Sequence, residues 1–197
     1  MHNLVFRRRE QKYLLTHKSD FFLREAYKTM RTNVTFALAS EKPCSTIIVT
    51  SSMQSEGKSI TATNLAISYA MADQKVLIID CDMRRPTLAK KLKIRKKPGL
   101  SSHLTGQCSL EELVQYCGIP GDEQAFHVIA AGQNPPNPVE LLSSEKMTEA
   151  LEALRQHYDY VILDLPPVGE VSDAMVIAKE TDGILLVVRQ NFCNRIV

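Results

Sequence analysis

The sequence lacks any long hydrophobic run, and this absence is the first constraint on its class. Among its 197 residues, the uninterrupted apolar stretches, such as Ile184–Val188, contain five residues or fewer. A membrane-spanning helix needs about 20 apolar residues, so we expect no segment that crosses a bilayer. The amino-terminal letters MHNLVFRRREQKYLL place a basic cluster after a short apolar run, which is not the order of a secretory signal.

The sequence also lacks an excess of charge of either sign and has little glycine or proline. Its 24 basic and 22 acidic residues leave a net charge of +2, which is too balanced to indicate a nucleic-acid-binding protein by itself. The 8 glycines and 9 prolines exclude collagen-like and low-complexity classes. With 44% apolar and 23% charged residues, the composition is globular, and the length predicts one domain, with or without an appendage.

Cysteines in metal-binding or redox spacing are missing as well. The five cysteines form no CxxC motif, and none has a histidine at the spacing of a zinc site. An odd number of cysteines without such spacing is typical of reduced thiols in a cytoplasmic protein. They are Cys44, Cys81, Cys108, Cys117 and Cys193.

What the sequence does contain is a series of short aliphatic runs separated by helical patterns. The runs are continuously apolar instead of alternating, which is typical of parallel strands covered on both faces. Apolar residues spaced by three or four predict helices over residues 58–72 and 144–157. Strands that alternate with helices predict an α/β fold, with ligand chemistry at the carboxyl ends of a parallel sheet. The runs span residues 46–50, 76–80, 127–130, 160–164 and 184–188.

The chain divides at about residue 21. Residues 1–21 are polar and basic, so we expect a loose arm there. Residues 22–197 form the predicted domain, which opens on an amphipathic helix over residues 22–39. The segment 131–138 carries three prolines, which predicts a rigid connection at a strand end.

A candidate phosphate-binding loop follows the first predicted strand. The P-loop pattern is G-x-x-x-x-G-K-[ST]; here Ser52 stands at the first glycine, whereas Gly57, Lys58 and Ser59 match. In such a loop the backbone N–H groups point at phosphate oxygens, the lysine reaches the β- and γ-phosphates, and the serine hydroxyl can ligate Mg²⁺. The alternative is a serine-capped helix after an ordinary strand. The predicted nucleotide-binding residues are Gln54, Ser55, Glu56, Gly57, Lys58, Ser59 and Ile60.

Two other predicted strands deliver aspartates at their ends. Asp80 and Asp82 close the second strand, and Asp164 closes the fourth. One such aspartate could simply cap the following turn. Two strands that bring carboxylates beside a phosphate loop indicate instead a site for ATP with Mg²⁺.

At these motifs the sequence resembles the cytoplasmic bacterial tyrosine kinases of capsule and exopolysaccharide biosynthesis, the CpsD/CapB type. The resemblance extends from about Phe22 to the last residue. It implies a MinD/ParA-like P-loop fold, namely a mostly parallel sheet flanked by helices on both faces. Four ordered segments carry it: SEGKS at 55–59, IDCDMRRP at 79–86, AGQNPPNPVELL at 131–142 and ILDLPPVGEVSDA at 162–174.

The resemblance also implies the chemistry. Members transfer the γ-phosphoryl group of ATP to tyrosine, so Lys58, Asp80 and Asp82 are the expected catalytic residues; either aspartate could be the base, and Asp80 is favoured. By the same resemblance, Mg²⁺ is expected on Ser59, Asp82 and Asp164. ATP and Mg²⁺ are therefore the expected cofactors, and tyrosine-containing proteins are the expected substrates.

The helix over residues 22–39 carries a pattern similar to the family's oligomerisation motif Glu-x-x-Arg-x-x-Arg. Glu25 and Arg31 match it, and Lys28 replaces the middle arginine. Residues three apart share a helix face, so the resemblance implies a ring-forming homo-oligomer; a solvated helix face is the alternative. The resemblance further implies a transmembrane polysaccharide co-polymerase or adaptor that activates the kinase. Such a partner would recruit it from the cytoplasm to the inner face of the plasma membrane.

The sequence departs from the family at its carboxyl end. The family continues past the fifth strand into further structure and a tyrosine-rich tail, whereas this sequence ends at Val197 and has no tyrosine after Tyr160. The expectation is therefore a kinase domain whose C-terminal part is missing. A MinD/ParA-like ATPase switch and an inactive truncated remnant are the alternative interpretations.

Six of the eight residues at 90–97 are basic. The plain interpretation is a solvated excursion near the rim of the site. The alternative is a docking patch for an acidic partner or for anionic lipid. Because no aromatic residue is interleaved with these charges, we do not expect nucleic acid as a partner.

Overall fold

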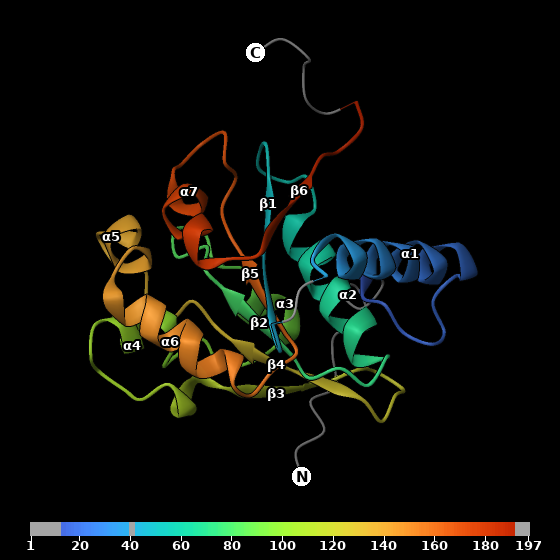
Figure 1. Ribbon diagram of the computed structural model, residues 1–197, viewed down its shortest axis with the longest axis horizontal. Helices are drawn as coiled ribbons and strands as arrows, with labels where there is room; N and C mark the ends of the chain where they lie inside the picture. Colours follow the sequence, from blue (N-terminus) through green and yellow to red (C-terminus); the bar gives the residue numbers. More distant parts are fainter. Residues whose placement is uncertain (1–12, 40–41, 192–197) are drawn as a thin grey trace.

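The computed structural model describes residues 13–39 and 42–191 (Figure 1). At its centre is a six-stranded sheet in the order β3-β4-β2-β5-β1-β6. Every neighbouring pair is parallel except β3 with β4, which confirms the mostly parallel α/β fold. The strands are β1 Ser45–Ser51, β2 Val76–Asp80, β3 Gln115–Gly118, β4 Ala125–Ile129, β5 Tyr160–Asp164 and β6 Gly183–Val187.

Helices lie on both sides of this sheet. In Figure 1, α1 and α2 (blue to teal) occupy one side, and α5, α6 and α7 (orange) occupy the other. The α-helices are α1 Phe21–Ala37, α2 Lys58–Ala70, α3 Leu88–Leu92, α4 Leu100–Leu104, α5 Pro138–Leu142, α6 Glu145–Arg155 and α7 Asp173–Ile177, and the 3-10 helices are η2 Glu111–Leu113 and η3 Ala178–Glu180.

The central strands are buried on both faces. Leu77 of β2 belongs to a hydrophobic cluster with Leu151 of α6, and the next residue, Ile78, belongs to a second cluster with Leu65 of α2. All four side chains are fully buried. Because successive strand residues point to opposite faces, a strand covered twice must be apolar at every position, and this explains the continuous runs in the sequence.

The edge strand β6 departs from that expectation. Ile184 and Leu186 are exposed by 54% and 51%, whereas Leu185 and Val187 pack against the cluster that includes α2. One face of β6 is therefore without a covering helix in the part of the chain that the structure describes. A continuous apolar run does not by itself reveal this difference between an edge strand and a central one.

Strand β3 is the element that the sequence patterns miss. Its residues QYCG contain no aliphatic run, and only Cys117 is buried. The strand forms by antiparallel pairing with β4, in which Cys117 lies opposite Phe126. Pairing with a distant segment, and not local propensity, therefore creates this strand.

The segment before α1 is packed where the structure describes it. Leu14 and Leu15 are buried in the cluster that includes α2. The Asn64 side chain of α2 accepts a hydrogen bond from the Leu15 N–H and donates one to the Tyr13 carbonyl, both at 2.8 Å. The loose arm predicted for residues 1–21 is thus wrong for residues 13–15. Residues 1–12 lie outside the described residues.

Candidate functional site

The loop between β1 and α2 has the backbone of a phosphate-binding loop. Ser55 and Gly57 are both left-handed, with φ of 64° and 99°. Gly57 is the N-cap of α2, and no side chain caps the helix. The N–H groups of the first turn are therefore available to an external anion, which the positive end of the helix dipole also favours. The serine-capped helix considered from the sequence does not form here.

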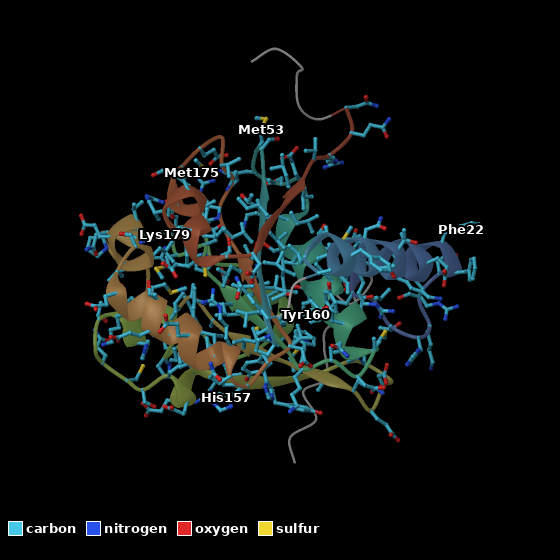
Figure 2. All side chains as sticks on the ribbon, in the orientation of Figure 1. Phe22, Met53, His157, Tyr160, Met175 and Lys179 are labelled. Atoms are coloured by element: carbon cyan, nitrogen blue, oxygen red, sulfur yellow. The ribbon has the colours of Figure 1, made fainter. Side chains whose placement is uncertain are left out.

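The carboxyl ends of three strands meet beside this loop. Asp164 of β5 lies opposite Asp80 of β2 and opposite Val49 of β1. Figure 2 shows Met53 of the loop at the top of the molecule, above Tyr160, which begins β5 near the middle of the view. Asp80 and Asp164 therefore lie side by side at the carboxyl edge of the sheet, where the chain leaves β1 for the loop.

Lys58 connects the loop to the strand ends. Its ammonium lies 2.9 Å from Asp82 Oδ2 and 3.2 Å from Asp164 Oδ1. Burial alone would lower the pKa of Lys58, but the two carboxylates outweigh it and the pKa is raised. The lysine is therefore charged and held between the two strand ends by these carboxylates.

Asp164 provides the observation that tests a fit for Mg²⁺. The side chain is fully buried, and its Oδ2 atom has no hydrogen-bond partner. Burial raises the pKa of Asp164 against the opposing effect of Lys58. A buried oxygen without a partner is costly, and a divalent cation would satisfy it.

The available oxygen ligands suit Mg²⁺ bound together with a nucleotide better than a metal ion coordinated by side chains alone. No group of three or more histidine, cysteine or acidic side chains is arranged to hold a metal ion within residues 13–39 and 42–191. Mg²⁺ is usually bound by one or two carboxylates together with substrate phosphates and water. The Ser59 hydroxyl, which accepts a hydrogen bond from Thr87 at 3.2 Å, and Asp164 match that type of site.

The position of Asp80 argues against the base role expected for it. Its carboxylate accepts hydrogen bonds from the N–H groups of Asp82 at 3.3 Å, Thr87 at 3.1 Å and Leu88 at 3.0 Å. Burial, with the nearby Asp164, raises the pKa of Asp80 to about 8. The side chain is fully buried. It therefore anchors the turn from β2 into α3.

A cavity of about 480 Å³ opens over the loop. Of the three predicted aspartates, only Asp82 lines it. Glu56 and Ile60, which were expected to bind nucleotide, are not among the lining residues. The cavity is lined by Gln54, Ser55, Gly57, Lys58, Ser59, Asp82, Arg84, Arg85, Thr87, Lys91, Pro166, Pro167, Glu170 and Val171.

Apart from Lys58, the sequence patterns did not assign the basic residues of this cavity. Arg84 is held by Asp173 of α7, with both hydrogen bonds at 3.3 Å. Arg85 donates to the Gln54 side chain, and Lys91 lines the same wall. Both arginines belong to the segment IDCDMRRP, so that segment was the available signal. Their direction into the cavity depends on the turn that Asp80 anchors.

The predicted oligomerisation residues are not arranged as one stripe. Glu25 and Lys28 form an exposed ion pair at 3.6 Å. The Arg31 guanidinium instead donates to the backbone carbonyl and hydroxyl of Ser68 on α2. Arg31 therefore holds α1 against α2, which corrects the expectation that it faces a neighbouring subunit together with the other two.

Comparisons with known proteins decide the family. Residues 44–194 match the family model described as an AAA domain. The chain is 40% identical over 164 residues to the tyrosine-protein kinase YwqD of Bacillus subtilis, covering 83% of this chain and 67% of YwqD. This chain belongs to the bacterial tyrosine-protein kinase family. The resemblance drawn from its motifs is thereby confirmed.

Solved structures agree with that membership. The kinase domain of the Escherichia coli tyrosine kinase ETK matches with a TM-score of 0.81 and 37% identity, covering 87% of this chain and 65% of that chain. The tyrosine-protein kinase ptk of Acinetobacter johnsonii is 37% identical over 187 residues, which is 95% of this chain but 25% of ptk. This chain thus spans between a quarter and two thirds of the length of these relatives.

More distant structures share only the fold. The septum site-determining protein MinD of Pyrococcus horikoshii, solved with Mg-ADP, matches with a TM-score of 0.61 at 22% identity, covering 74% of this chain and 58% of that chain. The P-loop fold of this kinase family member is thus common to nucleotide-binding ATPases.

Within the described ranges, none of the helices of this chain has the length and apolar character to cross a membrane.

Proposed function

We propose that this chain is the catalytic domain of a protein-tyrosine kinase, which transfers the γ-phosphoryl group of ATP to a tyrosine hydroxyl. The observation that carries the proposal is the Lys58 ammonium, held by Asp82 and Asp164 from two strand ends beside an uncapped helix N-terminus. A triphosphate with a divalent cation can replace this internal ion pairing with stronger charge compensation. Family membership supports tyrosine as the acceptor.

Binding is the first task of these residues. The backbone N–H groups of Gln54 to Ser59 would donate hydrogen bonds to the phosphate oxygens. The Lys58 ammonium would turn from the carboxylates to the β- and γ-phosphates. Ser59 and Asp164 are the residues that would hold Mg²⁺. When bound, that ion neutralises charge on the phosphates during transfer.

Asp82 is the residue we assign to proton transfer, because it alone of the three aspartates lines the cavity. The tyrosine oxygen forms a bond to the γ-phosphorus as the bond to the bridging oxygen breaks, and ADP leaves. The hydroxyl proton goes to the Asp82 carboxylate, which Lys58 has released. This assignment replaces both the base role of Asp80 and the metal-ligand role of Asp82 that were expected from the sequence.

The partners follow from the family and are part of the same proposal. A transmembrane polysaccharide co-polymerase would activate this domain at the inner face of the plasma membrane, in capsule or exopolysaccharide biosynthesis. A ring of copies would use the exposed Glu25 and Lys28 on α1, with Arg31 fixing the helix from behind. The exposure of Phe22 on the same helix supports a further contact surface there.

The test is the substitution Lys58→Met. Purified protein with Mg-ATP and a cytoplasmic peptide of the adaptor is expected to phosphorylate a tyrosine substrate, and Lys58→Met is expected to abolish the signal. The reason is that a methionine of similar length cannot compensate phosphate charge. The measurement is antiphosphotyrosine detection together with nucleotide affinity.

The matched control is Lys179→Met, which removes an exposed lysine that pairs with Glu180 and is not among the residues that line the cavity. It is expected to keep the activity of the parent protein. Tyrosine phosphorylation that persists in Lys58→Met would refute the assigned site. ATP hydrolysis stimulated by DNA or lipid, without phosphotyrosine, would favour a MinD-like switch instead.

A further inference from the structure

Glu56 is an acidic residue inside a loop built to bind an anion. A carboxylate there repels a triphosphate by its charge, so its presence needs a compensating function. The residue is 6% exposed, and its side chain does not line the cavity. It therefore points to the side of the loop away from the site.

The carboxylate closes the loop on itself. Its Oε2 atom accepts hydrogen bonds from the Ser52 hydroxyl at 2.8 Å and from the Met53 N–H at 2.7 Å. Ser52 occupies the position where the P-loop pattern has its first glycine. A charged acceptor that bridges the first and fifth positions of the loop restricts its shape, because hydrogen bonds to charged groups are among the stronger ones.

The same carboxylate reaches a second element. Its Oε1 atom accepts a hydrogen bond from the Arg189 N–H at 3.1 Å. Arg189 follows β6, which is the edge strand beside β1. Glu56 thus joins the phosphate loop to a segment 133 residues away in the chain.

A further contact fixes the base of the loop. The Val168 N–H donates to the Ser51 carbonyl at 2.9 Å. An added Cβ on Gly169 would lie 2.4 Å from the Ser52 carbonyl, so this wall leaves the loop no room to relax on that side. Glu56 holds the same end of the loop through the Ser52 hydroxyl and the Met53 N–H.

We propose that Glu56 is a positioning residue, which holds the phosphate loop in its binding shape and couples it to the segment after β6. The inference rests on the proposed function only in taking Mg-ATP as the ligand. If Glu56 has this role, the position of Arg189 after β6 helps to set the affinity for the nucleotide. A displacement of that segment would release one oxygen of Glu56 and loosen the loop.

Two variants separate geometry from charge. Glu56→Gln removes the charge and places an amide N–H against a backbone donor, whereas Glu56→Asp keeps the charge but is too short to bridge both partners. We expect both to weaken Mg-ATP binding on the order of tenfold, and to raise KM for ATP more than they lower kcat. A residue that acted by charge alone would give tighter binding in Glu56→Gln and unchanged binding in Glu56→Asp.

The coupling has its own pair of variants. Arg189→Pro removes the N–H that Glu56 accepts, and Arg189→Ala keeps that N–H while removing the side chain. We expect Arg189→Pro to bind Mg-ATP several-fold more weakly than Arg189→Ala. Equal affinities would overturn the coupling to the segment after β6.

The measurements are calorimetric titration with Mg-ATP and thermal unfolding without nucleotide, which reports any loss of fold separately. Glu152→Gln, an exposed carboxylate on α6, is the control for loss of one negative charge. If the parent protein does not bind Mg-ATP, the proposed function fails. If it binds, and both Glu56 variants bind as tightly, the inference fails while the proposed function stands.

Discussion

At the scale of single residues, the ionisable groups at the strand ends contact oppositely charged groups or backbone N–H donors. Lys58 lies between Asp82 and Asp164, and Asp80 accepts backbone N–H groups. An unpaired charge removed from water costs several kcal/mol, so these contacts are a condition for placing charge at the strand ends. Asp182, at the amino end of β6, follows the same rule on the opposite edge of the sheet.

The contacts of Asp182 predict that the stability of the fold depends on pH. Its carboxylate accepts a hydrogen bond from the Thr46 N–H at 2.8 Å and pairs with Lys42 at 2.5 Å. Burial would raise the pKa of Asp182, but these two partners outweigh it and the pKa is lowered. A carboxyl whose pKa is lower in the folded state stabilises the fold above its ordinary pKa, near about 4, and loses this contribution as the pH falls through the folded value.

We therefore expect Asp182→Asn to be less stable than the parent protein at pH 7, by about 1 kcal/mol, because part of the ion pair is exposed and screened. The difference is expected to shrink as the pH falls below about 4. Urea unfolding of both proteins at pH 7 and at lower pH measures it. A difference that stays constant with pH would contradict the assigned role.

At the scale of elements, contacts on α2 hold the segments that precede β1. The Asn64 side chain forms hydrogen bonds with the backbone of Tyr13 and Leu15, and the Ser68 carbonyl accepts a hydrogen bond from Arg31 of α1. The amphipathic pattern predicted α1 itself, but it did not predict that the Arg31 side chain would turn toward α2. A helix face shows which side is polar; the neighbouring element decides whether a charge on it contacts solvent or protein.

Asn64→Ala is expected to release the segment before α1. The substitution leaves the buried N–H of Leu15 without its acceptor, which costs about 1–3 kcal/mol. Limited trypsin digestion should then cleave after Lys18 faster than in the parent protein. Asn33→Ala, which removes an exposed amide on α1, is the control and should leave the rate unchanged; cleavage at equal rates in all three proteins would refute this docking.

At the scale of the whole molecule, the parallel sheet brings the carboxyl ends of its central strands to one edge, and the binding cavity lies there. The core on both faces of the sheet is independent of the nucleotide, whereas the site contains a buried oxygen of Asp164 without a partner. Binding of a nucleotide with its cation should therefore stabilise the whole fold, because the cation would give this oxygen a partner.

We expect Mg-ATP to raise the melting temperature. At a ligand concentration of about 100 times Kd, the gain is about 2.7 kcal/mol. Removal of divalent cations with EDTA should abolish most of it, and Lys58→Met should show little gain under either condition. Differential scanning fluorimetry measures the shifts. A shift that is equal with and without divalent cations would argue against a metal at Ser59 and Asp164.

The sequence by itself determined the fold class, the phosphate loop and the strand ends that carry aspartates. These features are local. Continuous apolar runs indicate strands that are buried on both faces, and the loop motif indicates the backbone of a phosphate-binding loop. Only the tertiary structure decided which carboxylate reaches the cavity, because Asp80 and Asp82 are two residues apart and differ in what packs against them. It also decided that Glu56 turns away from the site and that Arg31 turns inward. Side-chain direction depends on partners far along the chain, and those partners exist only once the sheet and its helices have assembled.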